Sequence, residues 1–432
     1  MRQPCFKGQN ETAPATVGIE PAPRLPLDSD PGRPERGDDM PVRRPADPIQ
    51  PTNRRGVREG HPHASAPFAV PGHLPGMCFL MCIAPWHLLQ WRPHFMSLPR
   101  LAAIAACLTL STLTFAAPTQ YPLTVENCGS TLTFAHAPTK AVTIGQAGTE
   151  MLYELGLGDK LVGTSLWFNN VLPRFKAQND KVERLADNEP GFEAVIGKRP
   201  ELVVVQLEWM VGKQGAVGTR EQFHDLKIPT YILPSDYEGK DNLVGADGTR
   251  LEPFRIETIY KSIEQLAQVF DVQDRGDALV AQLKTRLSAA IANVNQNKAN
   301  DVSALFWFSS SEIASDPFVA GRKGIPDFML NSLGMRNIVQ SDEEWPTVGW
   351  ETIAKANPSI LVIARMDRRR FPADDYLKKI AFLKSDPVTR NMDAVKHDRI
   401  VIIDAEGMQA GLRLFTGFEE LADAANRFNA AR

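Results

Sequence analysis

Cysteine and histidine are scarce in this 432-residue sequence beyond its first 116 residues. Cys128 is the one cysteine there, which excludes an intramolecular disulfide in that part of the chain, and we interpret it as a small hydrophobic residue. A zinc or manganese site needs convergent imidazoles and carboxylates. His136, His224 and His397 lie far apart and show no metal-ligand spacing. The sequence therefore predicts neither a metal site built from side chains nor a resident cofactor.

Motifs of the common enzyme classes are also missing, because the chain has no P-loop, no HExxH and no GxSxG. The run 212–218 is rich in glycine but lacks the lysine-serine or lysine-threonine ending, so we interpret it as a flexible loop. Gly156 and Gly158 are expected to end a helix, since no third glycine completes a dinucleotide fingerprint. We predict that the protein is not an enzyme. The alternative is a secreted enzyme whose active site is assembled from residues distant in sequence.

Positive and negative residues are also nearly balanced. The formal net charge is −3, with 43% hydrophobic and 23% charged residues, which is ordinary for a soluble globular protein. Such a balance gives no electrostatic reason to expect nucleic acid or an anionic membrane surface as a partner. We predict a monomer that binds no nucleic acid.

The first 95 residues differ in composition from the rest. They hold seventeen of the thirty-three prolines and many arginines. Such a segment buries too little apolar surface to offset its ordering entropy, so it is predicted to be disordered if it is made at all. We predict that 1–95 are a spurious or disordered extension.

A secretory signal follows from Met96. Arg100 supplies a positive n-region, 101–115 an apolar h-region, and Thr114-Phe115-Ala116 a small-x-small cleavage site. We therefore predict that translation starts at Met96, that Met96–Ala116 is a signal peptide, and that the protein is periplasmic or secreted. The alternative is a genuine extension with an internal signal-anchor. In a second alternative, Ile104-Ala105-Ala106-Cys107 is a lipobox and Cys107 carries the lipid anchor.

Short apolar runs alternate with amphipathic stretches from Tyr121 onward. Apolar runs bounded by turn residues predict buried strands, and the stretches between them predict helices. This alternation is typical of parallel α/β layers. The predicted strands are 141–145, 160–165, 201–206, 230–235, 303–308, 359–364 and 399–404, and the helices in the first half are 149–157, 191–198 and 219–227.

Two consecutive helices, 253–270 and 274–296, interrupt that rhythm. In the second helix an apolar stripe runs at spacings of three and four residues, and it would reach roughly 30 Å. The fold is predicted to be α/β, with two lobes around parallel sheets joined by one long α-helix. The predicted boundaries are 117–253 for the first lobe, 254–298 for the helical connection and 299–432 for the second lobe. The stripe consists of Leu279, Leu283, Leu287, Ile291 and Val294.

An internal repeat supports this division. GFEAVIGKRPELVVV (191–205) aligns without a gap with GWETIAKANPSILVI (349–363). Each copy opens with Gly-aromatic-Glu, has a proline seven residues after the glutamate, and closes in branched apolar residues. A proline is expected where a helix has ended and a strand begins. The repeat places Glu193 and Glu351 at equivalent points on two lobes, as a two-fold-symmetric partner would require.

Five segments in the same order resemble the class III periplasmic binding proteins, the substrate-binding subunits of iron-siderophore, heme and cobalamin importers. The resemblance covers essentially all of 121–432. The segments are 142–165 (VTIGQAGTEMLYELGLGDKLVGTS), the two repeat copies, 316–339 (DPFVAGRKGIPDFMLNSLGMRNIV), and 383–404 with the closing FEELADAANRF (418–428).

This resemblance implies a ligand cleft between two lobes that open and close little. It also implies that Glu193 and Glu351 dock onto arginines of a permease dimer, which works with its ATPase subunits. The function expected is delivery of a metal chelate to an ABC importer, with an iron-siderophore ranked first and cobalamin or heme after it.

In an α/β lobe, ligands meet the loops at the carboxyl ends of the strands. Aromatic and cationic residues in those loops suit a large, partly apolar, anionic chelate. For each tryptophan, core packing is the competing interpretation. The predicted ligand-binding residues are Gln146, Trp167, Trp209, Tyr237, Trp307, Arg322 and Arg368.

Overall fold

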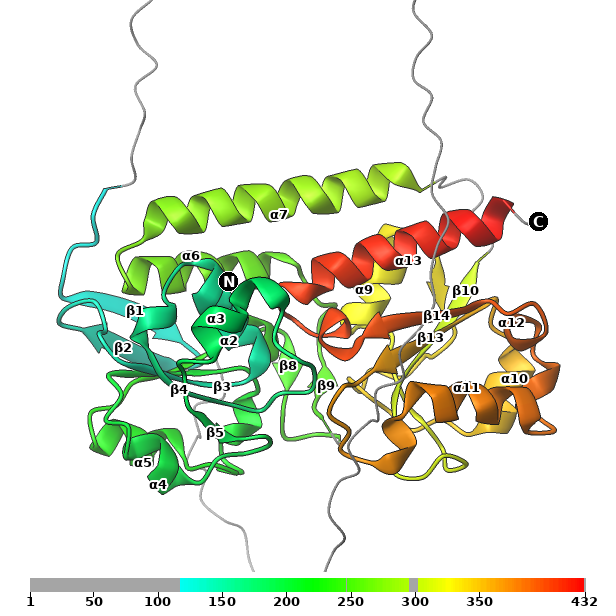
Figure 1. Ribbon diagram of the computed structural model, residues 1–432, viewed down its shortest axis with the longest axis horizontal. Helices are drawn as coiled ribbons and strands as arrows, with labels where there is room; N and C mark the ends of the chain where they lie inside the picture. The colour runs from blue at the N-terminus through cyan, green and yellow to red at the C-terminus, as the bar shows by residue number, and fades with distance from the viewer. Residues whose placement is uncertain (1–116, 246, 295–301, 431–432) are drawn as a thin grey trace, which may run out of the picture. The chain divides into compact units, whose positions relative to one another are not determined.

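The computed structural model describes residues 117–245, 247–294 and 302–430. The predicted extension 1–95 and signal peptide 96–116 lie outside the described residues. Two five-stranded sheets organise the described chain, and we call the parts around them the N-lobe and the C-lobe (Figure 1). The prediction of two α/β lobes is confirmed.

The N-lobe sheet has the order β5-β4-β3-β6-β7, and all its neighbouring strands are parallel. Every residue of β3 and β6 is buried, as expected for parallel strands covered on both faces. The strands are β3 (Ala141–Ile144), β4 (Leu161–Ser165), β5 (Arg184–Ala186), β6 (Leu202–Val205) and β7 (Thr230–Ile232). Two small antiparallel pairs accompany them: β1 (Leu123–Asn127) with β2 (Ser130–Phe134), and β8 (Lys240–Asp241) with β9 (Thr249–Arg250).

The C-lobe sheet has the order β11-β10-β13-β14, and β12 also pairs with β10. Its pairings are parallel except for β10 with β11. The strands are β10 (Ser303–Ser309), β11 (Phe318–Val319), β12 (Arg336–Asn337), β13 (Ile360–Arg365) and β14 (Ile400–Asp404). All seven strands predicted from apolar runs are therefore present.

The helices connect and cover these strands. The α-helices are α2 (Gln146–Glu154), α3 (Lys176–Asn179), α4 (Phe192–Ile196), α5 (Arg220–Asp225), α6 (Glu257–Val269), α7 (Gln273–Asn293), α9 (Ile325–Ser332), α10 (Trp350–Ala356), α11 (Tyr376–Ser385), α12 (Asp393–Lys396) and α13 (Arg413–Ala430). Single 3₁₀ turns are η1 (Gly158–Lys160), η2 (Pro173–Phe175), η3 (Glu208–Met210), η4 (Pro234–Asp236), η5 (Pro372–Asp374), η6 (Thr389–Asn391) and η7 (Ala405–Met408).

Helix α7 is the predicted long helix, with 21 residues. It packs against α6 and against α13, which lie side by side with it in Figure 1. Leu279 and Leu283 of the predicted stripe are buried, and Leu287 and Ile291 pack partly buried against the same core. The salt bridge of Arg286 with Glu419, at 2.8 Å, fastens α7 to α13 at the surface. The apolar stripe predicted from the sequence is therefore the face with which the connecting helix packs against its neighbours.

The internal repeat is a structural repeat. In both copies a glycine in extended conformation precedes a short helix, α4 after Gly191 and α10 after Gly349. The residues before the shared prolines, Arg199 and Asn357, both have left-handed backbone with φ of 50° and 45°. The strands β6 and β13 then follow. The predicted change from helix to strand is confirmed, although the residue before each proline is left-handed instead of extended.

Candidate functional site

A small cavity lies where the N-lobe strands β6 and β7 end, and residues of both lobes line it. Gln206 and Leu207 directly follow β6, and Ser235 and Asp236 belong to the turn after β7. Its volume of about 20 Å³ leaves room for about one water molecule. The other lining residues are Lys240, Asp247 and Arg250 from the β8–β9 segment and Ile325, Glu344, Gln409 and Ala410 from the C-lobe.

The first of two buried ion pairs in this cavity lies within the N-lobe. Lys240 Nζ is 2.8 Å from Asp236 Oδ1, and the two side chains are only 2% and 7% exposed. Burial is the largest single effect and opposes the charge of the ammonium, but the nearby carboxylates of Asp236, Asp247 and Glu344 together outweigh it and raise the pKa of Lys240. Asp236 also accepts the backbone N–H of Glu208. Because both charges are satisfied, Lys240 remains a cation beside the cavity.

The second ion pair crosses from the N-lobe to the C-lobe. The guanidinium of Arg250 binds the carboxylate of Glu344, and both side chains are buried. Arg250 Nη2 also donates to Ser235 O at 3.0 Å. Burial, the largest single effect, would raise the pKa of Glu344, but Arg250 and Lys240 together overcome that effect and lower it. A fully charged, desolvated pair therefore bridges the lobes at the cavity wall.

Main-chain hydrogen bonds reinforce this bridge. Arg250 N donates to Asp342 O at 2.8 Å, and Glu344 N donates to Gly248 O at 3.0 Å. An antiparallel bridge pairs Thr249 with Glu343 between them. The β8–β9 segment of the N-lobe is thus joined to the C-lobe by backbone as well as side chain.

Asp247 completes the charged lining of the cavity. Burial raises its pKa to about 6, against the opposing effect of Lys240. Asp236 and Glu344 add to the rise because they are like charges. The cavity thus holds three carboxylates and two cations, which leaves an acidic excess for a ligand to meet.

A second polar cluster, which we call the Glu406 cluster, joins the lobes beside this lining. Arg413 at the start of α13 donates through Nε and Nη2 to Glu150 of α2, with distances of 2.6 to 3.0 Å. Arg413 Nη1 donates to Asp404 Oδ2 at 2.7 Å, and Nη2 reaches Asn170 O at 2.7 Å. Figure 1 shows the start of α13 next to the N-lobe. One guanidinium therefore holds a carboxylate from each lobe.

Glu406 lies in the same cluster and has no cation of its own. It is 2% exposed, and its Oε1 atom has no hydrogen-bond partner. Burial is the main cause that raises its pKa to about 8, and Glu150 and Asp404 add to it as like charges. Arg413 and a hydrogen bond from Gln206 act in the opposite direction. Near neutral pH this carboxyl is largely protonated in the structure described.

Loops of the two lobes also meet directly. Asn169 Nδ2 donates to Arg365 O at 3.0 Å, and Asn170 N donates to Asp367 Oδ2 at 2.9 Å. Arg368 N donates to Phe168 O at 2.9 Å. Together with the Arg250–Glu344 bridge, these contacts hold the lobes closed around the small cavity.

The predicted tryptophans Trp167 and Trp307 are core residues, each 1% exposed. The indole N–H of Trp167 donates to Thr164 Oγ1 at 3.0 Å. Trp307 packs edge-on against Trp350 with ring centroids 4.8 Å apart, and its N–H reaches Ser310 Oγ at 2.9 Å. Little of either ring is left for a ligand in this arrangement of the lobes.

The other predicted ligand residues lie in varied surroundings. Buried Gln146 accepts the backbone N–H of Asn169 at 3.1 Å, so it shapes a loop at the lobe boundary. Arg368 places its guanidinium 5.7 Å from the ring centre of Phe168. The half-buried Trp209 and Tyr237 pack against the N-lobe core, and Arg322 is an exposed residue that pairs with Asp342. None of the seven predicted residues is among those that line the cavity.

Glu193 and Glu351 occupy equivalent, exposed positions in the first turns of α4 and α10. A helix N-terminus favours a carboxylate there. Within the described part of the chain, neither carboxylate has a recorded hydrogen bond or salt bridge. Both are therefore available to an external cation.

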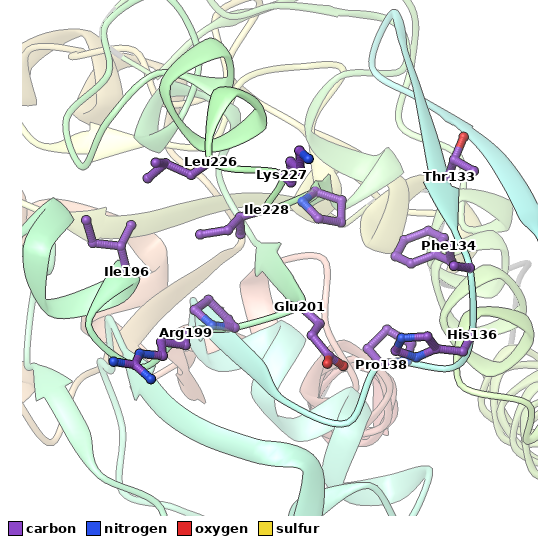
Figure 2. Close-up of a pocket in the computed structure, with 13 residues that line it drawn as sticks. Thr133, Phe134, His136, Pro138, Ile196, Arg199, Glu201, Leu226, Lys227 and Ile228 are labelled. Carbon is purple, nitrogen blue, oxygen red and sulfur yellow. The ribbon is translucent and has the colours of Figure 1, made fainter.

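A larger hollow of about 520 Å³ lies at the opposite end of the N-lobe strands (Figure 2). Pro200 and Pro229, which precede β6 and β7, line it, as do Phe134 of β2 and Leu226 after α5. It is open, is built from one lobe only, and lies at the amino ends of the strands. Ligands of α/β sheets bind at the carboxyl ends, so this hollow is not our candidate site.

Across 117–245, 247–294 and 302–430, no three histidine, cysteine, aspartate or glutamate side chains are grouped as metal ligands. The same ranges contain no helix with the length and apolar character needed to cross a membrane.

The sequence profile described as "Periplasmic binding protein" matches residues 142–406, which extend from β3 of the N-lobe to η7 of the C-lobe. The chain belongs to this family. The predicted resemblance is thereby confirmed, and the matched range contains most of both lobes, both repeat glutamates and most of the cavity lining. Periplasmic binding proteins of known sequence and structure extend the comparison.

One relative is the uncharacterized ABC transporter substrate-binding lipoprotein YvrC of Bacillus subtilis (strain 168), which is 26% identical over 70% of this chain and 85% of its own. A vitamin B12-binding protein of Vibrio parahaemolyticus is 25% identical over 55% of this chain and 74% of its own. A solved periplasmic binding protein from Veillonella parvula has a TM-score of 0.57 at 25% identity, covering 70% of this chain and 96% of its own.

Proposed function

We propose that this protein is the substrate-binding subunit of an ABC importer and carries a metal chelate between its two lobes. An iron-siderophore is our first choice of chelate, and cobalamin or heme are the alternatives. The observation that carries the proposal is a cavity lined by both lobes at the carboxyl ends of the N-lobe strands, in a chain of the periplasmic binding protein family. The relatives named as binding proteins support a role without catalysis.

The size of the cavity bears on how a chelate would bind. Pockets for such ligands measure about 300–1,000 Å³, whereas this cavity has about 20 Å³. A chelate therefore requires the β8–β9 segment to move away from the C-lobe, or the lobes to part further than the family resemblance implies. The contacts that must break are the Arg250–Glu344 bridge and the hydrogen bonds between 169–170 and 365–367.

The candidate ligand contacts combine two groups of residues. The cavity adds Lys240, Asp247, Arg250 and Gln409 to those predicted from the sequence. Of the predicted seven, the half-buried Trp209 and Tyr237 keep aromatic surface that opening could present to a ligand. The acidic excess of the cavity favours a neutral or cationic chelate over the anionic one expected from the sequence.

Export is part of the proposal. We propose a signal peptide at Met96–Ala116, with lipid attachment at Cys107 as the alternative. The name of the Bacillus subtilis relative, a lipoprotein, supports a location outside the cytoplasm. Amino-terminal sequencing of the exported protein tests this, and a start far upstream of Ala117 contradicts it.

Ligand binding is tested by native mass spectrometry of protein purified from its own periplasm, followed by thermal shifts with a ferric trihydroxamate, cyanocobalamin and hemin. A ligand at about 100 times its Kd is expected to stabilise the fold by about 2.7 kcal/mol. Asp247→Asn should change the preference among chelates of different charge, while the exposed Glu264→Gln on α6 should not. If no chelate binds and the protein converts a substrate, the enzyme alternative is correct.

Docking is tested separately by uptake in cells. We propose that Glu193 and Glu351 bind arginines of the two permease subunits. The double variant Glu193→Ala with Glu351→Ala is expected to abolish uptake and leave chelate affinity unchanged. Glu264→Ala, another exposed helical glutamate, is the matched control. Unchanged uptake in the double variant rejects the docking role.

A further inference from the structure

The open hollow at the amino ends of the N-lobe strands (Figure 2) has the features of a binding site separate from the interlobe cavity. Its volume of about 520 Å³ lies within the range of about 300–1,000 Å³ found for small-molecule pockets. Three segments that each contain a proline form its walls: 133–138 at the end of β2, 196–201 between α4 and β6, and 226–229 between α5 and β7. All of them belong to the N-lobe, so a ligand would enter without any movement of the lobes.

Apolar side chains form a large part of this lining. Phe134 and Ile228 are buried, Ile196 is half-buried, and Leu226 at the edge is 51% exposed. In Figure 2 Phe134 lies across the hollow from Ile196 and Ile228. A ligand between these walls would remove from water apolar surface that the protein itself leaves uncovered, which is a favourable process.

The charged groups of the hollow are predominantly positive. Arg199 and Lys227 are exposed, and within the described part of the chain neither side chain has a recorded hydrogen bond or salt bridge. The one carboxylate of the lining, Glu201, already accepts the backbone N–H of Thr139 at 2.6 Å and its hydroxyl at 3.0 Å. His136 also lines the hollow, and its Nδ1 lies 3.0 Å from a neighbouring backbone carbonyl. Two cations are therefore available to a ligand, whereas the carboxylate is already bound.

The internal repeat offers a comparison for Arg199. The equivalent residue of the second copy is Asn357, which has the same left-handed backbone and also precedes the shared proline. Asn357 exchanges two hydrogen bonds with Asp393 of α12, at 2.8 and 2.9 Å, so the C-lobe closes this position with its own residues. Asparagine tolerates left-handed backbone better than arginine does. The backbone conformation therefore does not explain an arginine at position 199, whereas a ligand in the hollow would.

We propose that this hollow binds a small amphipathic organic anion. Its apolar part packs between Phe134 and Leu226, and its carboxylate or sulfonate group pairs with Arg199 or Lys227. The two unpaired cations favour an anion over a cation, and the apolar walls favour a hydrocarbon part over a purely inorganic anion such as phosphate.

This site goes beyond the proposed carriage of a chelate and does not rest on it. The interlobe cavity lies at the carboxyl ends of the N-lobe strands, and the hollow lies at their amino ends. If an organic anion binds the hollow but no chelate binds the protein, only the proposed function fails. If a chelate binds but no organic anion binds the hollow, only the second site fails.

Octanoate is the probe, and its binding to the full chain is measured by isothermal titration calorimetry and by saturation-transfer NMR. We expect a single class of site. Octanamide has the same apolar chain without the charge, so it should bind about tenfold more weakly because it makes no charge-assisted hydrogen bond. Acetate has the charge without the apolar chain and should show no measurable binding, because it covers almost none of the apolar lining.

Variants of the lining locate the site. Arg199→Asn introduces the residue found in the second repeat copy, so it removes the cation and keeps a residue suited to left-handed backbone. Combined with Lys227→Asn, it is expected to weaken octanoate binding about tenfold or more. Leu226→Glu places a carboxylate at the edge of the hollow and should abolish binding. The matched controls are Arg390→Asn and Leu377→Glu, which change exposed residues of the C-lobe and should leave the affinity unchanged.

The second site is rejected if octanoate does not bind, including the case in which a protein partner is found to cover the hollow instead. It is also rejected if the Arg199→Asn and Lys227→Asn double variant and Leu226→Glu bind octanoate as the parent does, or if the controls weaken binding equally. All of these substitutions change exposed residues, so urea titrations should show folded variants. Should Leu226→Glu not fold, the affinity of the double variant decides.

Discussion

The two clusters that join the lobes differ in how their charges are balanced. In the cavity lining, Lys240 and Arg250 face three carboxylates, and each cation has a carboxylate partner. In the Glu406 cluster, one arginine faces three carboxylates. In each cluster the carboxyl without a cation partner has a raised pKa, about 6 for Asp247 and about 8 for Glu406.

This difference shows that burial alone does not fix the protonation state of an interlobe carboxylate. Glu344 and Glu406 are both buried, yet the pKa of Glu344 is lowered and that of Glu406 is raised. The nearby cations decide: Arg250 and Lys240 both lower the pKa of Glu344, whereas Glu406 has only Arg413, which already binds Glu150 and Asp404. Both pairs of the cavity cluster are therefore ionised, whereas the Glu406 cluster contains one carboxyl that favours a proton.

Removal of Arg413 should have the largest effect on stability. Arg413→Met leaves buried carboxylates without a cation, which typically costs about 3–5 kcal/mol. The free energy of unfolding from urea titrations measures it. Arg286→Met breaks the half-exposed pair between Arg286 of α7 and Glu419, which lies on α13 like Arg413. This loss should lower the free energy of unfolding by about 1 kcal/mol or less. If the free energy of unfolding fell equally in the two variants, burial of the Arg413 ion pairs would add nothing to their contribution to stability.

Much of the fold could be predicted from the sequence because its strands are buried on both faces. The apolar runs at β3, β6 and β13 have no exposed alternation that could be mistaken for another element. The apolar stripe located α7 to within a few residues at its start. Short or polar strands such as β5, β8 and β9 were missed, because their hydrogen bonding depends on neighbours distant in sequence.

The cavity lining was harder to predict. The loops after β6 and β7 were expected, since carboxyl ends of parallel strands meet at one edge. The pairing of Arg250 with Glu344 could not be predicted, because the two residues are 94 positions apart in the sequence. Each one alone is indistinguishable from a solvated surface charge. Trp167 and Trp307 are core residues, and aromatic character alone does not distinguish a side chain that stacks on a ligand from one that packs in the core.

Loss of the Arg250–Glu344 bridge should have the second-largest effect on the free energy of unfolding. Arg250→Met strands Glu344 in a buried site and is expected to cost about 3 kcal/mol in urea titrations. Replacing both partners, with Arg250→Met and Glu344→Met together, should recover most of that loss, because no uncompensated charge remains. In the double variant, failure to recover stability would show that the bridge contributes through packing or backbone geometry instead of charge.

The smallest effect is expected at the rim, where the loops of the two lobes meet. Asp367→Asn weakens the bond that the Asp367 carboxylate accepts from Asn170 N at an exposed position. Solvent competes for both groups, so the loss should be about 0.5–1 kcal/mol. Because this contact joins the lobes without crossing a core, its loss should widen the distance distribution between spin labels at Asp225→Cys in α5 and Lys396→Cys in α12, while the unfolding free energy changes little. A large loss of stability with unchanged lobe distances would mean that the rim contact supports its own loop, and that the lobes are held together by the buried clusters alone.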